Sequence, residues 1–265
     1  MKILILNSFP LVDNSYYKKK FLRELLSRKD VISQSAMVYS HTRLKDYYDQ
    51  AIQRVGKKES IVRFLNNRKA EKSKTSPDNN DRDLGNLNVD RFAQSLGCAV
   101  KKYARHNEPQ CLSFISAFAP DLIFNLSGMY IPKAIISASK YGVVSGHYAL
   151  LPDIRGGDTP RWTILLNKPM VVSHMFLAPE LDMGDIISRI TVDVNRGDSI
   201  FDIRKKCQLV NVQGALAVFD SIVNNKLERI PQKKEDGSMF YTMGQRLRNK
   251  VDEALQQQHY DHYCD

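Results

Sequence analysis

Long apolar runs are missing from this chain of 265 residues. Its apolar stretches are short and broken by polar residues, whereas a helix that spans a bilayer needs about 20 consecutive apolar residues. Residues 1–7 are too few for the core of a signal peptide, and they lack a small-residue cleavage site. We therefore expect a cytoplasmic protein with no membrane segment, in which residues 3–6 form a buried first strand.

Paired cysteines are also missing. The four cysteines, Cys98, Cys111, Cys207 and Cys264, form no C-x-x-C motif. Hydrophobic residues make up 43% of the chain, which is enough for a packed core in one large domain or in one domain with a small appendage. We therefore expect reduced, structural cysteines, and neither a disulfide framework nor a metal site.

Acidic residues are outnumbered by basic ones. Lys and Arg total 39 against 29 Asp and Glu, which gives a net charge of +10. Residues 43–74 hold ten basic and four acidic residues, a local charge of +6. A basic surface attracts polyanions such as nucleic acid or nucleotides, although such a run is also typical of a solvated face. Residues 44–90 have few large apolar residues, and we interpret them as a basic insertion: a helix over 44–66, then a mobile loop.

Outside this insertion, short apolar strands alternate with amphipathic helices. The opening reads strand, helix, strand, at residues 3–6, 15–27 and 31–39. The alternation continues up to residue 194, and a long helix then starts at Asp198 or Ser199. The pattern predicts an α/β fold with a mostly parallel, twisted sheet flanked by helices. We place a main domain at residues 1–198, and a C-terminal helix with a short tail subdomain at 199–265.

The most informative block lies between residues 120 and 189. It contains the segments PDLIFNLSGMYIP, GVVSGHYALLPDIRGGDTPRW and ELDMGDII. His147 falls at the carboxyl end of a predicted strand, where open α/β sheets bind their ligands. Asp182 follows 35 residues later, in a turn with Gly184. An imidazole and a carboxylate in one cleft form a general acid–base pair, although each residue taken alone is more often structural.

These segments, in this order and spacing, resemble the folate-dependent formyltransferase family over about residues 90–240. The family includes glycinamide ribonucleotide, methionyl-tRNA and nucleotide-sugar formyltransferases. The resemblance implies a Rossmann-like formyltransferase fold with its catalytic domain at residues 1–198, and transfer of a formyl group from 10-formyltetrahydrofolate to a primary amine. It further implies that His147 donates to the oxyanion, and that Asp182 orients the imidazole and relays protons.

The family's third catalytic residue is an asparagine two positions before the histidine, and this chain has Ser145 there. Ser145 and His147 share one face of the strand, so both point at the same space. Three interpretations stay open: serine and a water molecule suffice, another donor such as Asn125 compensates, or transfer is lost and the chain is a non-catalytic binding module. A 10-formyltetrahydrofolate hydrolase is a further alternative. A serine hydrolase is disfavoured because no G-x-S-x-G motif exposes Ser145.

The resemblance also implies a set of binding residues. Those expected along the folate are Gly128, Met129, Tyr130, Ile131, Leu181 and Gly184. Those expected at the acceptor are Arg155, Gly156, Asp158, Thr159 and Trp162. Two alternatives remain open on the residues alone, a core-capping turn at residues 128–132 and a core position for Trp162.

The acceptor is expected to be a nucleotide-linked amino sugar or another small amine. Methionyl-tRNA formyltransferases carry a full barrel after the catalytic domain, and residues 227–265 are short for one. Nucleotide-sugar formyltransferases have shorter tails, with a segment that Gln232, Gly237 and Tyr241 fit loosely. The net charge of +10 favours tRNA as the alternative acceptor. No membrane partner is expected, and a homodimer stays open.

Overall fold

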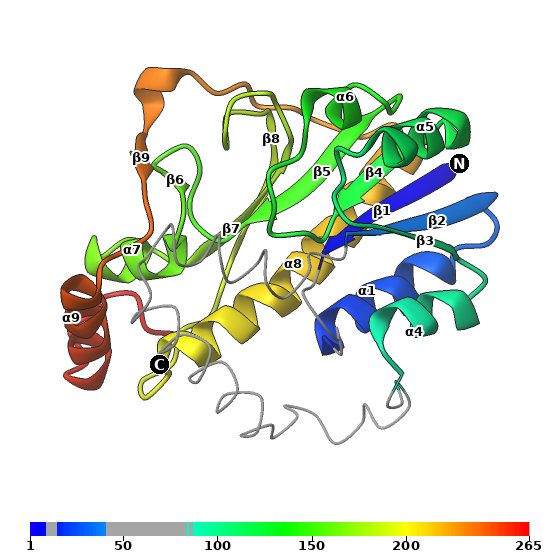
Figure 1. The fold of residues 1–265 in the computed structure, drawn as a ribbon. Helices are drawn as coiled ribbons and strands as arrows, with labels where there is room; N and C mark the ends of the chain where they lie inside the picture. Colours follow the sequence, from blue (N-terminus) through cyan, green and yellow to red (C-terminus); the bar gives the residue numbers. More distant parts are fainter. Residues whose placement is uncertain (9–14, 41–83, 85–86, 265) are drawn as a thin grey trace.

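A mostly parallel sheet forms the centre of the computed structural model, which describes residues 1–8, 15–40, 84 and 87–264 (Figure 1). Seven strands within these residues lie in the order β3-β2-β1-β4-β5-β7-β8. The parallel strands are β1 (Lys2–Ser8), β2 (Gln34–Ser40), β3 (Ala99–Tyr103), β4 (Leu122–Asn125) and β5 (Gly142–His147). β7 (Val171–Phe176) runs antiparallel to β5, and β8 (Ile186–Thr191) runs antiparallel to β7. The predicted α/β class is confirmed.

Helices cover both faces of this sheet, which explains why the central strands carry apolar side chains on both faces. In β1, Ile3 and Ile5 face one side, Leu4 and Leu6 face the other, and all four are fully buried. One face carries α1 (Tyr16–Leu26), α4 (Val89–Ser95) and α8 (Ile200–Val223). The other face carries α5 (Pro109–Phe118) and α6 (Lys133–Ile136).

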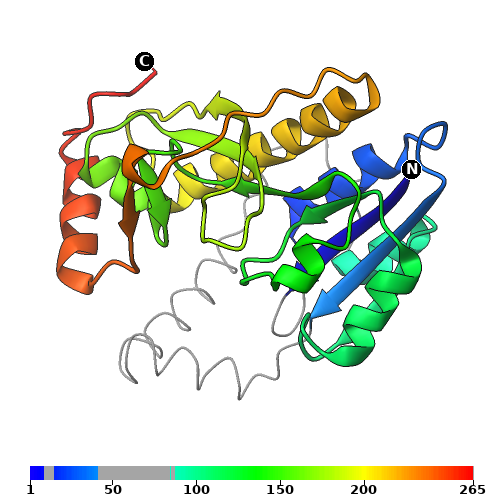
Figure 2. The ribbon, with the colours of Figure 1, turned by 90° about the horizontal axis from the view of Figure 1, so that it is seen from above.

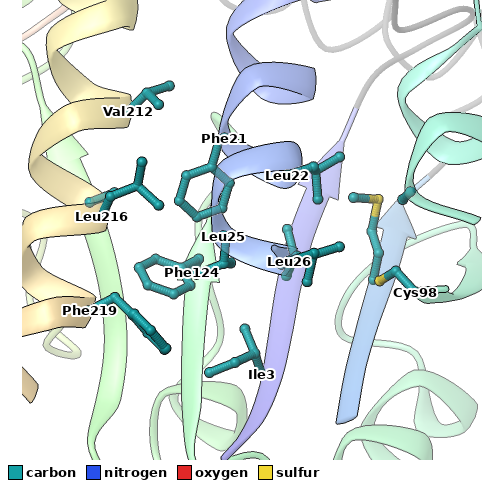
Figure 3. Close-up of a cluster of buried hydrophobic side chains, with 14 of the residues drawn as sticks. Ile3, Phe21, Leu22, Leu25, Leu26, Cys98, Phe124, Val212, Leu216 and Phe219 are labelled. Carbon is teal, nitrogen blue, oxygen red and sulfur yellow. The ribbon is translucent and has the colours of Figure 1, made fainter. Parts of the chain in front are cut away.

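The larger hydrophobic core joins α1 and α8 to the sheet (Figure 3). The rings of Phe21 on α1 and Phe124 on β4 meet edge to face, with centroids 5.1 Å apart. Phe219 of α8 packs into the same cluster. Ser199 caps α8 and exchanges hydrogen bonds with Asp202, which confirms the predicted start of this helix. The domain division at residue 198 stays a prediction.

A second, smaller group of elements lies at the end of the molecule away from β1 (Figure 2). β6 (Ile154–Gly156) and β9 (Ser238–Phe240) form a two-stranded parallel pair, and the 3₁₀ helix Lys234–Asp236 precedes β9. α7 (Thr159–Leu165) and α9 (Gln245–Gln256) pack with α8 around a separate core. These contacts tie residues 154–165 to the tail at 232–256.

The basic insertion lies largely outside the described residues. Its predicted helix over 44–66 falls within the range 41–83, as does most of the loop predicted after it, and α4 starts at Val89.

The second strand starts at Gln34 rather than at the predicted residue 31, because the backbone N–H groups of residues 31 and 32 donate to the carbonyl of Arg28. In the part of the chain that the structure describes, no helix is both long and apolar enough to cross a membrane.

Candidate active site

The candidate site lies where β4 and β5 end at the same edge of the sheet. Asn125 is the last residue of β4, His147 is the last residue of β5, and Ser145 pairs with Asn125 in the parallel ladder. Open α/β sheets bind ligands at the carboxyl ends of their strands. The structure therefore places Ser145 and His147 at the edge where a ligand is expected.

His147 faces a carboxylate at this edge. Its side chain is buried, and Nε2 donates to the carbonyl oxygen of Ile154 at 2.8 Å. That bond fixes the ring so that Nδ1 faces Oδ2 of Asp182 at 3.6 Å. The structure thus brings together two predicted residues that are 35 positions apart in the sequence. Imidazole nitrogens and carboxylate oxygens can both take up and release a proton, so this pair can exchange a proton with a ligand that lies beside Nδ1 and Oδ2.

Asp182 is held in a constrained turn between β7 and β8. Its backbone φ is +53°, a value that residues with a side chain rarely adopt. Its Oδ2 accepts from the backbone N–H of Gly156 at 2.7 Å. Gly184 packs so tightly against β7 that a Cβ there would lie 1.6 Å from the carbonyl oxygen of Phe176. These contacts fix the turn and so preorganise the carboxylate.

The C-terminal tail locks this turn through Gln232. The Nε2 of Gln232 donates to the carbonyls of Asp182, at 3.2 Å, and of Gly184, at 2.6 Å. Its Oε1 accepts from Nε and Nη2 of Arg155, each at 3.3 Å. Arg155 is 2% exposed, and its guanidinium also donates to two backbone carbonyls of the tail. Arg155, expected at the acceptor, is therefore tied to the segment that positions Asp182.

Asp158 is the centre of a separate ionic cluster. Its carboxylate lies 2.7 Å from Nη2 of Arg248, 2.9 Å from Nη2 of Arg204 and 3.7 Å from Nη1 of Arg161. It also accepts from the backbone N–H of Met243 at 3.0 Å. Burial raises the pKa of Asp158, but the arginines and this N–H together outweigh burial and hold the pKa below its usual range. The cluster joins α7, α8 and α9, and an acceptor role for Asp158 stays a prediction.

The other residues expected at the acceptor contact the tail as well. The indole N–H of Trp162 donates to the carbonyl of Tyr241 at 2.8 Å, and its ring centroid lies 5.0 Å from that of Phe240. Gly156 has a φ of +99°, and a Cβ there would lie 1.9 Å from the carbonyl oxygen of Phe240. Thr159 is buried at the start of α7. Residues 155–162 therefore contact the C-terminal tail, and the backbone N–H of Gly156 connects them to the carboxylate of Asp182.

The residues expected along the folate divide into exposed and buried side chains. Tyr130 is 68% exposed and Leu181 is 54% exposed, so both offer apolar surface to a ligand. Gly128 is exposed and Met129 is half-buried. Ile131, by contrast, is buried in the core on the α5 and α6 side of the sheet. Among the described residues, no group of three His, Cys, Asp or Glu side chains is placed to hold a metal ion.

Several residues that build the site carry no local sequence signal. Gln232 stands out in the sequence only as part of a loosely matching tail segment, and its contact with the Asp182 turn joins residues 50 positions apart. Arg204 and Arg248 bind Asp158 across 46 and 90 positions. Such contacts depend on how the tail folds back, which no pattern within one element predicts.

Fold and site together define a Rossmann-like α/β protein in which an imidazole at a strand end faces a preorganised carboxylate. In sequence, the chain is similar to the methionyl-tRNA formyltransferase of Geobacillus thermodenitrificans, with 31% identity over 145 residues, which cover 54% of this chain and 46% of that protein. The chain spans about half the length of the curated relatives it matches. No family model matches it.

Solved structures share the fold. A sugar N-formyltransferase from a Shewanella species superposes with a TM-score of 0.58 at 13% identity, over 97% of this chain and 87% of that chain. The N-formyltransferase of Helicobacter canadensis superposes with a TM-score of 0.54 at 15% identity, over 91% of this chain and 71% of that chain. The expected resemblance to folate-dependent formyltransferases is therefore confirmed, in fold over most of the chain and in sequence over about half of it.

Proposed function

We propose that this protein transfers a formyl group from 10-formyltetrahydrofolate to a primary amine on a nucleotide-linked amino sugar. The observation that carries the proposal is the pair of His147 and Asp182, with Nδ1 and Oδ2 3.6 Å apart at the carboxyl end of β5. Formyl transfer breaks the bond from the formyl carbon to N10 and forms a bond from that carbon to the acceptor nitrogen. The acceptor amine loses one proton and N10 gains one, so the reaction needs a group that takes up a proton and returns it.

The pair is suited to that task. With Nε2 held by Ile154, the Nδ1 edge of His147 and the carboxylate of Asp182 take the proton from the attacking amine and return one to the leaving nitrogen. Negative charge collects on the formyl oxygen in the transition state, and hydrogen-bond donors at the strand ends stabilise it. The exposed side chain of Leu181, next to Asp182 in the chain, supports binding of a flat, aromatic donor beside the pair, and the exposed ring of Tyr130 offers a further apolar surface.

Two observations bear on the acceptor. The matches to the Shewanella and Helicobacter proteins extend over 97% and 91% of the chain, and the Helicobacter protein was solved with folinic acid and dTDP-3-aminofucose. These matches support a nucleotide-linked sugar. The relative with 31% identity is a methionyl-tRNA formyltransferase, and the basic stretch at 43–74 suits a polyanion, so methionyl-tRNA is the second candidate. The cytoplasmic location and the homodimer stay predictions.

A turnover assay separates these functions. The purified protein is incubated with 10-formyltetrahydrofolate and, in separate reactions, with dTDP-3-aminofucose, with methionyl-tRNA or without an acceptor; formylated product and free formate are then measured. We expect formylated sugar in excess of formylated tRNA and of formate. Formylated tRNA as the only product would show that the acceptor is methionyl-tRNA rather than a nucleotide-linked sugar. Formate released at the same rate with and without an acceptor would indicate a hydrolase. Binding of folinic acid without any turnover would indicate a binding module.

A further inference from the structure

Asn125, one of the donors considered above as compensation for Ser145, borders the candidate site. It ends β4 and pairs in register with Ser145 of β5, the next strand in the sheet (Figure 1). Residues that pair across neighbouring strands point to the same face, and Ser145 and His147, two positions apart, share that face. Asn125, Ser145 and His147 therefore line one surface at the carboxyl ends of β4 and β5.

Ser127 orients the carboxamide of Asn125. The Oδ1 of Asn125 accepts from the backbone N–H of Ser127 at 3.0 Å and from its Oγ at 2.7 Å. A backbone N–H can only donate, so the amide oxygen faces Ser127 and Nδ2 faces away from it. Nδ2 donates to Oγ of Ser145 at 3.3 Å. A primary amide has two N–H groups, and within the described ranges no acceptor takes the second one.

We propose that Asn125 is a catalytic residue, which donates this second N–H to the formyl oxygen as negative charge develops there. The inference rests on the proposed function. The family resemblance assigns the oxyanion donor to His147, but its Nε2 already donates to the carbonyl of Ile154. The formyl oxygen therefore needs a further donor at the strand ends. Asn125 supplies one that its neighbours already hold in place. Ser145 is then a positioning residue, because its Oγ accepts the first N–H and fixes the plane of the amide.

Of the three interpretations of Ser145, this geometry favours compensation by another donor. A hydroxyl at position 145 is short, but it is long enough to reach the amide of Asn125 on the next strand. The carboxamide would thus serve the site from β4, one strand away from the histidine.

Three variants test the inference. Asn125→Asp keeps the size and the acceptor for Ser127 but removes the N–H donors. Asn125→Ser removes the carboxamide. The exchange variant combines Asn125→Ser with Ser145→Asn and so moves the carboxamide to β5. Asn249→Asp, on an exposed position of α9, is the matched control. For each protein, kcat at saturating donor, the Kd for folinic acid and the melting temperature are measured.

We expect kcat to fall by about 10²–10³-fold in both single variants of Asn125, with the Kd for folinic acid nearly unchanged, because the lost donor acts in the transition state. The exchange variant is expected to recover at least about ten-fold of that loss, since the donor returns to the same surface. The control variant is expected to keep the kcat of the parent.

A kcat within about three-fold of the parent in either single variant would overturn the inference, because loss of an oxyanion donor costs far more. An exchange variant no faster than Asn125→Ser would overturn it too, since the effect would then come from the structure of the strand end. A Kd for folinic acid that weakens as much as kcat falls would instead assign Asn125 to ground-state binding, which also rejects the inference. A parent protein that formylates no acceptor would overturn the proposed function itself, and the inference with it.

Discussion

Asp158 and Asp182 are alike in burial and backbone but differ in their partners. Both side chains are 12% exposed, and both residues have left-handed backbones, with φ of +56° and +53°. Each carboxylate also accepts one backbone N–H, from Met243 and Gly156 respectively. Asp158, however, lies among three arginines, whereas Asp182 faces the imidazole of His147.

The two carboxylates therefore differ in whether a neighbour can exchange a proton. A guanidinium stays protonated in proteins, so the cluster around Asp158 holds helices together but cannot move a proton. An imidazole gains and loses a proton near neutral pH. Burial and an unusual backbone do not distinguish the carboxylate proposed to act in catalysis, that of Asp182, from the arginine-bound carboxylate of Asp158, because both residues have them. The neighbouring side chain makes the distinction.

The first prediction removes the charge of Asp182. We expect Asp182→Asn to lower kcat for formyl transfer by about 10²–10⁴-fold, because the amide still accepts from Gly156 but cannot take up a proton. The melting temperature is expected to stay close to that of the parent. Asp30→Asn, at an exposed position, is the control. An Asp182→Asn protein as fast as this control would remove Asp182 from the chemistry.

The second prediction applies the same change to Asp158, where we expect a loss of stability rather than a loss of activity. We expect Asp158→Asn to lower the free energy of unfolding by about 3 kcal/mol, because three partly buried arginines lose their counter-charge. Urea denaturation measures this loss, and kcat per folded molecule is expected to change little. Unchanged stability together with lost transfer would contradict a purely structural role and would support the acceptor role that the family resemblance implies for Asp158.

The third prediction concerns Gln232, which links the two regions. In Gln232→Glu the acceptor for Arg155 remains, but the N–H groups that hold the carbonyls of Asp182 and Gly184 are lost. We expect kcat to fall by up to about 10²-fold, since small displacements of a preorganised group are costly. The pH profile of kcat is expected to change as well, because the environment of the carboxylate changes. Gln245→Glu, exposed on α9, is the control, and identical pH profiles for both variants would argue against positioning through Gln232.

The smallest expected effect concerns the stability of the protein and a second histidine, His174, whose ring hydrogen-bonds to Ser188 and Asn211 rather than to a carboxylate. His174 is fully buried between β7 and α8, and burial lowers its pKa, although hydrogen bonds to Asn211 offset part of the shift. The unfolded chain therefore binds a proton on this residue more readily than the folded protein does. The stability that depends on neutral His174 is fully present above about pH 6.5 and is lost as the pH falls.

We accordingly expect the free energy of unfolding of the parent to fall as the pH is lowered below about 6.5, and to fall less steeply in His174→Gln. Urea denaturation at a series of pH values measures both slopes. Parallel curves for the parent and the variant would show that His174 does not contribute to the acid sensitivity.

The sequence predicts those secondary-structure elements whose formation depends on residues close together along the chain. The buried strand β1 follows from one short apolar run, and the start of α8 follows from a serine with an aspartate three positions later. The position of His147 at a strand end follows in the same way, because residues 142–146 read as a strand before a turn, and β5 ends at His147.

The partners of the site residues could not be predicted in this way. Arg155 and Asp158 stand in a turn that the family resemblance assigns to the acceptor, but they bind Gln232 and Arg248, which lie 77 and 90 positions further on. The hydrogen bond between Asn125 and Ser145 depends on the register of two parallel strands. Register and tail docking are set by packing over the whole chain, so the sequence indicates the residue types but not their partners.

A crystal structure with folinic acid tests the central claim most directly, namely that the strand ends of β4 and β5 form the site of formyl transfer. We predict that the ligand binds at this edge, with N10 in the space shared by His147, Asp182 and Asn125. Folinic acid bound at another place, with no contact to His147 or Asp182, would contradict the account.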